Sequence, residues 1–222
     1  MILTNVLYRT FFIKAAQYGT AFTVDVEGVE YLVTAKHLLD ASVRQFELQI
    51  FHNKKWLRGP ATVVGHGKGE IDISVLRVDS RLTPSGFDVI TSMGELALAQ
   101  DVFFLGFPYK MWGDVGAFMG GLPCPFAKKG ALSSVRFENP QVLYVDAINN
   151  EGFSGGPLFF YRMGNPNELR IVGVVSKFRV EQEAVLDEHG VPTKMSVPYN
   201  TGFLVAYGIK HALELIPPQT RV

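Results

Sequence analysis

Cysteine is almost absent from the 222-residue chain. Cys124 is its single cysteine, so no disulfide can form within one chain, and a small secreted domain held together by disulfides is excluded. Because Cys124 lies between two prolines and has no second cysteine to pair with, we interpret it as a small apolar residue rather than a nucleophile.

An excess of charge and long apolar runs are also missing. The chain has 21 Lys and Arg residues against 21 Asp and Glu residues, so no overall field attracts nucleic acid or an anionic membrane. No run of 18 apolar residues is present, and residues 1–9 lack the basic start and apolar segment of a signal peptide. We therefore expect a cytoplasmic protein with neither a nucleic-acid nor a membrane partner.

The residues that are abundant indicate an all-β protein. Hydrophobic residues make up 47% of the chain, which also contains 22 Gly and 12 Pro, a composition that favours many short strands joined by tight turns. Apolar residues alternate with a period of two in several segments, and short apolar runs bounded by turn residues occur in others. The expected strands are 6–13, 20–26, 30–35, 45–51, 55–57, 61–64, 71–78, 101–105, 131–137, 141–147, 158–161, 169–176 and 200–205.

Three further segments lack a strand pattern. Residues 109–129 are rich in Gly, Met, Trp, Phe and Pro without a clear period, which predicts a long loop. The charged segment 181–194 is expected to be a solvated hairpin or loop. Residues 207–216 have helical spacing and end at two prolines, which predicts a C-terminal helix.

The most informative stretch is GFSGGP at residues 152–157, in which three glycines surround Ser154. A serine nucleophile needs a tight turn, a base and backbone N–H groups directed at the developing oxyanion. Gly152 and the pair Gly155-Gly156 can form such a turn, because glycine tolerates positive φ and a close approach of substrate. The alternative is an ordinary glycine-rich hairpin turn that happens to contain a serine.

A base and an acid for Ser154 are found elsewhere in the chain. His37 follows an apolar strand-like run, and Asp72 stands beside two isoleucines at the head of another such run, where a carboxylate needs a polar partner. An imidazole N–H would be such a partner. The other four histidines lie in polar turns or in the C-terminal helix and are interpreted as solvated or packing residues; they are His52, His66, His189 and His211.

The glycine-rich segment 65–69 contains one lysine but is not a nucleotide site. It lacks the spacing of a phosphate-binding loop and precedes a strand instead of a helix. Acyl-enzyme chemistry at Ser154 would need no metal or cofactor, and none is expected.

These motifs resemble those of trypsin-like serine proteases, and most closely those of the protease domain of bacterial HtrA (Deg-type) proteases. The histidine, aspartate and serine motifs are VTAKH at 33–37, DISVL at 72–76 and GFSGGPL at 152–158. Further similarity lies at residues 19–22, 106–108, 145–147, 173–176 and 200–203.

The resemblance implies a single peptidase domain over residues 1–222. Its fold would be two antiparallel six-stranded β-barrels of the chymotrypsin type with the active site between them and a short C-terminal helix. The N-terminal barrel is expected at about 1–80, a linker at 81–98, the C-terminal barrel at 99–206 and the helix at 207–216.

The resemblance also implies a role for each matched residue. Ser154 would be the nucleophile, His37 the general base and then acid, and Asp72 the carboxylate that orients the histidine. The N–H groups of Gly152 and Ser154 would form the oxyanion hole. The pocket for the residue before the scissile bond would be lined by Ile148, Ser176, Lys177, Phe178, Gly202 and Phe203.

Two departures from the family pattern are informative. Phe153 replaces the aspartate that digestive members use to receive a newly cut N-terminus, and no activation site precedes the first strand, so activation of that kind is not expected. The bulky Phe153 is expected beside the oxyanion donors, where it would occlude or reshape the substrate site. No PDZ domain is expected after the helix.

Together these features predict a serine endopeptidase that acts on a peptide or protein through an acyl-enzyme intermediate. None of the expected pocket residues is a carboxylate, which predicts a preference for small or medium apolar side chains before the scissile bond. A regulatory protein partner is a further hypothesis. The alternatives are a protease-fold module that binds a peptide or protein with little or no cleavage and, less favoured, an esterase.

Overall fold

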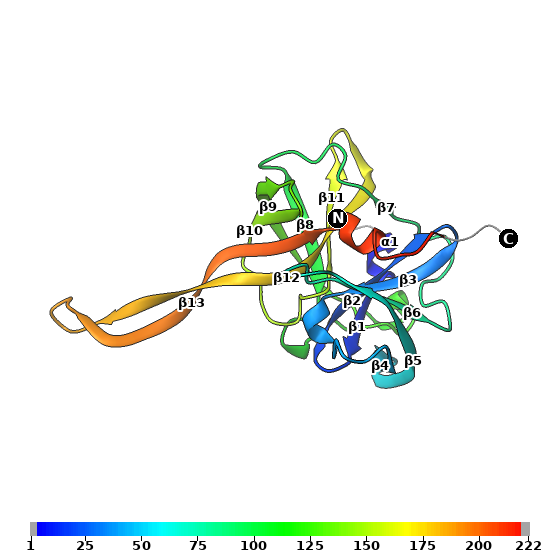
Figure 1. Cartoon of the computed structure of the whole chain (residues 1–222), viewed down its shortest axis with the longest axis horizontal. Helices are drawn as coiled ribbons and strands as arrows, with labels where there is room; N and C mark the ends of the chain where they lie inside the picture. Colours follow the sequence, from blue (N-terminus) through cyan, green and yellow to red (C-terminus); the bar gives the residue numbers. More distant parts are fainter. Residues whose placement is uncertain (1–3, 219–222) are drawn as a thin grey trace.

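Two β-barrels pack against each other in the computed structural model, which describes residues 4–218 (Figure 1). The first barrel is closed, with neighbouring strands in the order β1-β2-β3-β6-β5-β4 and β4 returning to β1. All of its pairings are antiparallel. Its strands are β1 (Thr10–Lys14), β2 (Tyr18–Val26), β3 (Val29–Thr34), β4 (Gln45–His52), β5 (Lys55–His66) and β6 (Ser74–Val78).

The second sheet is ordered β11-β8-β9-β10-β13-β12-β7, and a pairing of β11 with β12 closes six of these strands on themselves. The short β7 adds to β12 in parallel, a pairing that the sequence did not indicate. The strands are β7 (Ile90–Thr91), β8 (Asp101–Gly106), β9 (Phe126–Arg136), β10 (Val142–Asp146), β11 (Pro157–Arg162), β12 (Asn165–Leu186) and β13 (Pro192–Gly208). The predicted all-β fold of the chymotrypsin type is confirmed.

A shared apolar core joins the two barrels. Phe22, Val33 and Ile73 of the first barrel belong to the same buried cluster as Leu105 and Phe159 of the second, and all five side chains are fully buried. Burying apolar surface contributes about 25 cal/mol per Å², so this core holds the barrels in one relative position. The residues that precede or follow the strands of the two barrels can therefore form one site.

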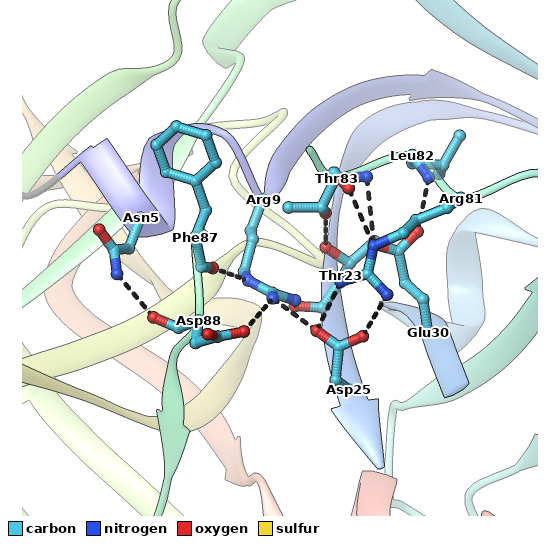
Figure 2. Close-up of polar contacts among 10 residues, drawn as sticks. All are labelled: Asn5, Arg9, Thr23, Asp25, Glu30, Arg81, Leu82, Thr83, Phe87 and Asp88. Carbon is cyan, nitrogen blue, oxygen red and sulfur yellow. Dashed lines mark hydrogen bonds and ion pairs between the residues drawn. The ribbon is translucent and has the colours of Figure 1, made fainter. Parts of the chain in front are cut away.

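A polar network fastens the connection between the barrels to the first barrel (Figure 2). The guanidinium of Arg9, 1% exposed, donates to the Asp25 carboxylate at 2.5 Å and to the Phe87 carbonyl at 2.5 Å. Arg81 donates to the same carboxylate at 2.8 Å, and the Glu30 carboxylate accepts the backbone N–H groups of residues 82 and 83. Burial raises the pKa of Asp25, but the hydrogen bonds from Arg81 and Arg9 outweigh this effect and lower it.

β12 and β13 continue beyond the second barrel as a long two-stranded ribbon that projects from the body (Figure 1). Their pairing runs from Gly173 with Gly208 out to Leu186 with Pro192. Several large apolar side chains along it are exposed, among them Met195, Val197 and Tyr199. The charged segment 181–194 is therefore a hairpin, as one of the two expectations had it.

Three predicted boundaries were wrong. The chain begins with a helical turn, α1 (Thr4–Leu7), and the first strand starts only at Thr10, whose hydroxyl donates to the Val6 carbonyl. The C-terminal helix α2 covers only Lys210–Leu213, because residues up to 208 are still paired in β13.

No helix in the described part of the chain is long and apolar enough to span a membrane.

The third wrong boundary is that of the predicted loop 109–129. It contains two 3-10 turns, Pro108–Lys110 and Gly116–Met119, and an isolated bridge between Gly113 and Cys124. It ends when β9 begins at residue 126.

Candidate active site

Pairing of β3 with β6 brings the predicted base and acid together. Thr34 lies opposite Ser74 in this antiparallel pair, so the residues just after β3 meet those just before β6. His37 lies in the 3-10 turn Lys36–Leu38 that follows β3. Its Nδ1 is 2.7 Å from Asp72 Oδ2, and its backbone N–H donates to Asp72 Oδ1 at 2.9 Å.

The Asp72 carboxylate remains ionised in this position. Burial raises its pKa, but hydrogen bonds from His37 and from the Ser176 hydroxyl, the latter at 2.5 Å, lower the pKa to about 2. An ionised carboxylate only accepts hydrogen bonds, so His37 Nδ1 carries a proton, and in the neutral imidazole Nε2 is then an acceptor. The imidazole is therefore in the tautomer that a general base requires.

Close contacts of the Ser154 loop with both barrels explain its glycines. At φ +100°, Gly152 adopts a conformation that other residues rarely take, and a Cβ there would lie 2.1 Å from the Phe107 carbonyl oxygen. Gly155 has φ +83°, and a Cβ there would lie 2.1 Å from the Thr20 carbonyl oxygen. The loop therefore presses on β2 of the first barrel as well as on its own barrel, which an ordinary hairpin turn would not do.

Hydrogen bonds fix Ser154 beside β2. The Thr20 N–H donates to the Ser154 carbonyl at 3.0 Å, and the Thr20 hydroxyl donates to the Gly152 carbonyl at 2.6 Å. The Ser154 hydroxyl donates to the Ser176 carbonyl at 2.7 Å. Within residues 4–218, no hydrogen bond joins this hydroxyl to His37. Ser176 thus links the two halves, since its hydroxyl binds Asp72 and its carbonyl binds Ser154.

The backbone N–H groups of Gly152 and Ser154 have no protein acceptor within the described chain. The preceding carbonyls are occupied: that of Glu151 accepts the Tyr109 N–H at 3.0 Å, and that of Phe153 accepts the Gly156 N–H at 2.9 Å. The C=O and N–H of a trans peptide point in opposite directions. Each free donor therefore points away from the carbonyl contact that holds its peptide.

Phe153 does not cover the donors, contrary to the expectation from its size. Its side chain is fully buried in the second barrel, where its ring lies edge-on to Phe104 at 5.1 Å between centroids. A Cβ at Gly106 would come within 2.6 Å of the Phe153 ring, so this glycine makes room for it. An apolar side chain at this position needs no charged partner.

A second layer of contacts supports the loop from behind, and the sequence did not indicate it. The Lys128 ammonium donates to the Ile148 carbonyl at 2.7 Å and to the Asn150 side-chain oxygen, and it lies 5.3 Å from the centroid of the Phe153 ring. The Asn150 side chain in turn donates to the Tyr109 hydroxyl at 3.0 Å. Burial lowers the pKa of Lys128.

Of these supporting residues, Tyr109 had the clearest sequence signal, because the Gly-Phe-Pro turn directly precedes it. Ser176 had a weaker sequence signal. It is a polar residue at the end of an apolar strand, just as Asp72 is a polar residue at the start of another. Lys128 and Asn150 carry no such signal.

The six predicted pocket residues are only partly gathered. Lys177, Phe178 and Phe203 line one cavity of about 810 Å³, together with Tyr144, Arg179, Val180, Glu181, Thr201 and Val205. Ser176 is buried beside Asp72, and Gly202 lies beside Asp146, whose Oδ1 is 4.0 Å from the place a Cβ would take. Ile148 is 60% exposed and does not line the cavity.

The remaining histidines take no part in this arrangement. His52 contacts the Gly120 carbonyl at 3.1 Å, and the His66 ring contacts the Ser74 hydroxyl at 2.7 Å. The buried His211 accepts the Gln141 N–H at 2.8 Å. Burial raises the pKa of the Cys124 thiol, which makes it a poor nucleophile. The described residues contain no cluster of three or more His, Cys, Asp or Glu side chains that could hold a metal ion.

Comparison with known proteins shows to which family the chain belongs. A family model described as a trypsin-like peptidase domain matches residues 19–166. Among curated protein sequences no significant match is found.

Solved structures give many matches. The inactive form of the Rv3671c protease, from M. tuberculosis, has a TM-score of 0.59 and 16% identity, over 96% of this chain and 89% of that one. The HtrA-type protease AlgW with a tripeptide has a TM-score of 0.57 and 20% identity, over 95% of this chain and 60% of that one. A serine endoprotease from Yersinia pestis has a TM-score of 0.57 and 18% identity, over 95% of this chain and 62% of that one. The chain thus spans less than two thirds of the length of the last two proteins, and at these identities the likeness shows the fold alone.

Proposed function

Since the chain belongs to the family of trypsin-like peptidases, we propose that it is a serine endopeptidase in which Ser154, His37 and Asp72 act together. The observation that carries this proposal is the carboxylate–imidazole pair: Asp72, with a pKa of about 2, accepts from His37 Nδ1 at 2.7 Å. That contact leaves Nε2 free to take the proton of a serine.

The Ser154 hydroxyl has to turn before it can react, because at rest it donates to the Ser176 carbonyl. A substrate that lies along residues 176–178 brings a main-chain N–H to this carbonyl and competes with the hydroxyl for it. The released hydroxyl is then free to rotate about χ1 and donate to His37 Nε2. Substrate binding in this scheme both positions the peptide and frees the nucleophile.

The chemical step follows the acyl-transfer sequence. Ser154 Oγ attacks the carbonyl carbon while His37 takes its proton, and the oxyanion lies against the N–H groups of Gly152 and Ser154. His37 then protonates the leaving amine, and the C–N bond breaks to leave an acyl-enzyme. Water, deprotonated by His37, attacks the ester and releases the acid. Removing one oxyanion donor typically costs about 3–4 kcal/mol of transition-state stabilisation.

Covalent labelling tests the proposal. A fluorophosphonate probe, which phosphonylates an activated serine, should label the protein at Ser154. Labelling should disappear in Ser154→Ala and persist in Ser133→Ala, where the replaced serine is exposed. Labelling that persists in Ser154→Ala, or no labelling of a correctly folded wild type, contradicts the assignment.

A binding module with little or no cleavage is the second candidate. The observation in its favour is the resting contact of the Ser154 hydroxyl with Ser176 instead of His37. Under this alternative, a peptide would bind along residues 176–178 without labelling or hydrolysis at any peptide concentration.

For the residue before the scissile bond we propose a small or medium apolar side chain. The supporting feature is the 810 Å³ cavity, which aromatic and aliphatic side chains line together with Lys177, Arg179, Glu181 and Thr201. Its carboxylate, that of Glu181, is paired with Arg179 at 2.5 Å. A cleavage profile from a peptide library checks this preference. A profile dominated by Lys or Arg would overturn it and would indicate that the exposed Asp146 carboxylate beside Gly202 reads that residue.

A further inference from the structure

An aromatic ring with two lysine ammonium groups near it lies on the part of β2 that leads to the Ser154 loop. The Tyr18 ring has the Lys110 ammonium 4.3 Å and the Lys14 ammonium 5.0 Å from its centroid. Lys14 and Tyr18 face each other across the β1–β2 pair, whereas Lys110 comes from the 3-10 turn after β8. Neither lysine forms a salt bridge with a carboxylate in residues 4–218. We call Lys14, Tyr18 and Lys110 the lysine–tyrosine site.

This site lies next to the reacting groups. The Gln17 side chain donates to the His37 carbonyl at 3.3 Å, and Thr20, two residues after Tyr18, donates to the Ser154 carbonyl at 3.0 Å. Tyr109, the neighbour of Lys110, donates its N–H to the Glu151 carbonyl at 3.0 Å. The lysine–tyrosine site is thus anchored to the histidine turn and to the oxyanion loop at once.

The backbone of the turn that carries Lys110 is held in an unusual conformation. Tyr109 has φ +51° and Lys110 has φ +64°, so two consecutive residues other than glycine adopt the left-handed region. Such residues cost free energy and persist where the surrounding structure requires them, often at functional sites. Here the strained turn places Lys110 over a ring that already has a lysine beside it, and two like charges near one ring repel each other. A bound anion would relieve that repulsion.

We propose that the lysine–tyrosine site binds an acidic side chain of the substrate, one to three residues after the scissile bond. This inference rests on the proposed peptidase function. The residues before the bond lie along 176–178, and His37 protonates the amine that departs, so the leaving segment passes on the His37 side. There an Asp or Glu carboxylate meets the ammonium groups of Lys14 and Lys110 beside the Tyr18 ring. The substrate class is therefore polypeptides with an acidic segment just after the cleaved bond.

The test uses pairs of internally quenched peptides that differ only by Asp or Asn at the three positions after the scissile bond. Wild-type protein should cleave the Asp peptide with a kcat/KM about fivefold higher, the size expected of partly exposed ion pairs. In the double variant Lys14→Gln/Lys110→Gln this ratio should fall to about one. In Lys14→Arg/Lys110→Arg it should be retained, because both cations remain.

A matched control removes two other exposed cations. Arg77→Gln/Lys194→Gln changes the net charge by the same amount, and its ratio should equal that of the wild type. Raising the salt concentration from 0.05 to 0.5 M should shrink the wild-type ratio, since salt screens exposed charges.

The outcomes separate this inference from the proposed function. If the fluorophosphonate probe labels Ser154 and both peptides are cleaved equally, or if the ratio survives the loss of both lysines, the lysine–tyrosine site does not read acidic residues but the peptidase assignment stands. If the wild type is neither labelled nor cleaves either peptide, both proposals fall.

Discussion

The two halves of the candidate active site are held in different ways. In the first barrel, His37 and Asp72 make two hydrogen bonds to each other, one through the backbone and one through the ring. In the second barrel, no hydrogen bond within residues 4–218 joins the Ser154 hydroxyl or the N–H groups of Gly152 and Ser154 to that pair, whereas Ser176 bonds both Asp72 and Ser154. The proposed base and its carboxylate partner are therefore assembled at rest, whereas the hydroxyl of the proposed nucleophile does not yet contact the base.

The difference shows where control over the reaction can act. The short antiparallel pairing of β3 with β6 brings His37 and Asp72 together within the first barrel, and the Ser176 hydroxyl of the second barrel adds a hydrogen bond to Asp72. Ser154 lies on a loop that is held by Thr20 of β2 and is supported from behind by Tyr109, Asn150 and Lys128, which lie outside the first barrel. We therefore expect substitutions in the first half to change the chemistry of the base. Substitutions in the second half should change the population of the Ser154 loop conformation that can react.

The largest effect is expected from breaking the first half. In Asp72→Asn, the amide can donate to His37 Nδ1 and hold the ring in the wrong tautomer, so kcat should fall about 10⁴-fold with KM little changed. Peptide hydrolysis by purified protein measures this, with circular dichroism to confirm the fold. Asp79→Asn, an exposed control, should keep full activity. A kcat within tenfold of wild type for Asp72→Asn would show that the carboxylate does not orient the base.

The next effect comes from distorting the second half. In Gly152→Ala, the new Cβ would meet the Phe107 carbonyl oxygen at 2.1 Å in a residue with φ +100°, so the peptide must rotate and withdraw its N–H. The kcat should fall about 10²- to 10³-fold, as for the loss of one oxyanion donor. Gly28→Ala separates strain from clash, because Gly28 has φ +79° with no atom within 4 Å of a new Cβ. That control should lose stability but keep kcat, and an equal loss of kcat in both variants would contradict the role of Gly152.

A third prediction concerns the pH dependence of stability in the first half. The pKa of Asp72 falls from 3.8 to about 2 on folding, which corresponds to about 2 kcal/mol of folding free energy at neutral pH. Because the folded pKa is the lower one, this contribution is present above about pH 4 and is lost as the pH falls through about 2. Denaturant unfolding of wild type and Asp72→Asn should therefore differ by about 2 kcal/mol at pH 6 and converge near pH 2.

Ser176→Ala is the matched comparison for that experiment. It keeps the carboxylate but removes one hydrogen bond that lowers its pKa, so the curve for this variant should lie between the other two. A difference between wild type and Asp72→Asn that does not shrink on acidification would mean that Asp72 gains nothing from ionisation in the folded protein.

The smallest effect is expected from loosening the support of the Ser154 loop. Tyr109→Phe removes the hydroxyl that accepts from Asn150 but leaves the backbone N–H on the Glu151 carbonyl. We expect kcat to fall about three- to tenfold, in line with the loss of one hydrogen bond, while KM stays within twofold. Tyr199→Phe on the exposed ribbon is the control and should match wild type. A rise in KM alone would show that Tyr109 contacts substrate and does not position the loop.

Local patterns in the sequence were sufficient to predict most strands, the closure into barrels by family resemblance and the three motifs of the site. They failed where a contact between distant segments decides the local conformation. The C-terminal helix is shorter than its spacing suggested because β13 stays paired through residue 208. Phe153 was expected to occlude or reshape the substrate site, but Gly106 of a neighbouring strand leaves space for its ring inside the barrel. The pocket residues after Ser176 lie along the β12–β13 ribbon. The charged segment 181–194 did not predict how long this ribbon is.

By itself, the sequence determined which chemical groups are available: one histidine and one aspartate at strand ends, and a serine among glycines that alone permit its turn. It could do so because strand periodicity and the need for positive φ are properties of neighbouring residues. Only the tertiary structure decided what the serine hydroxyl contacts at rest, which carbonyls hold the oxyanion peptides, and that Lys14 and Lys110 meet at one ring. Those contacts join residues up to about 130 positions apart, such as Thr20 and Gly152, and packing of the two barrels brings them together.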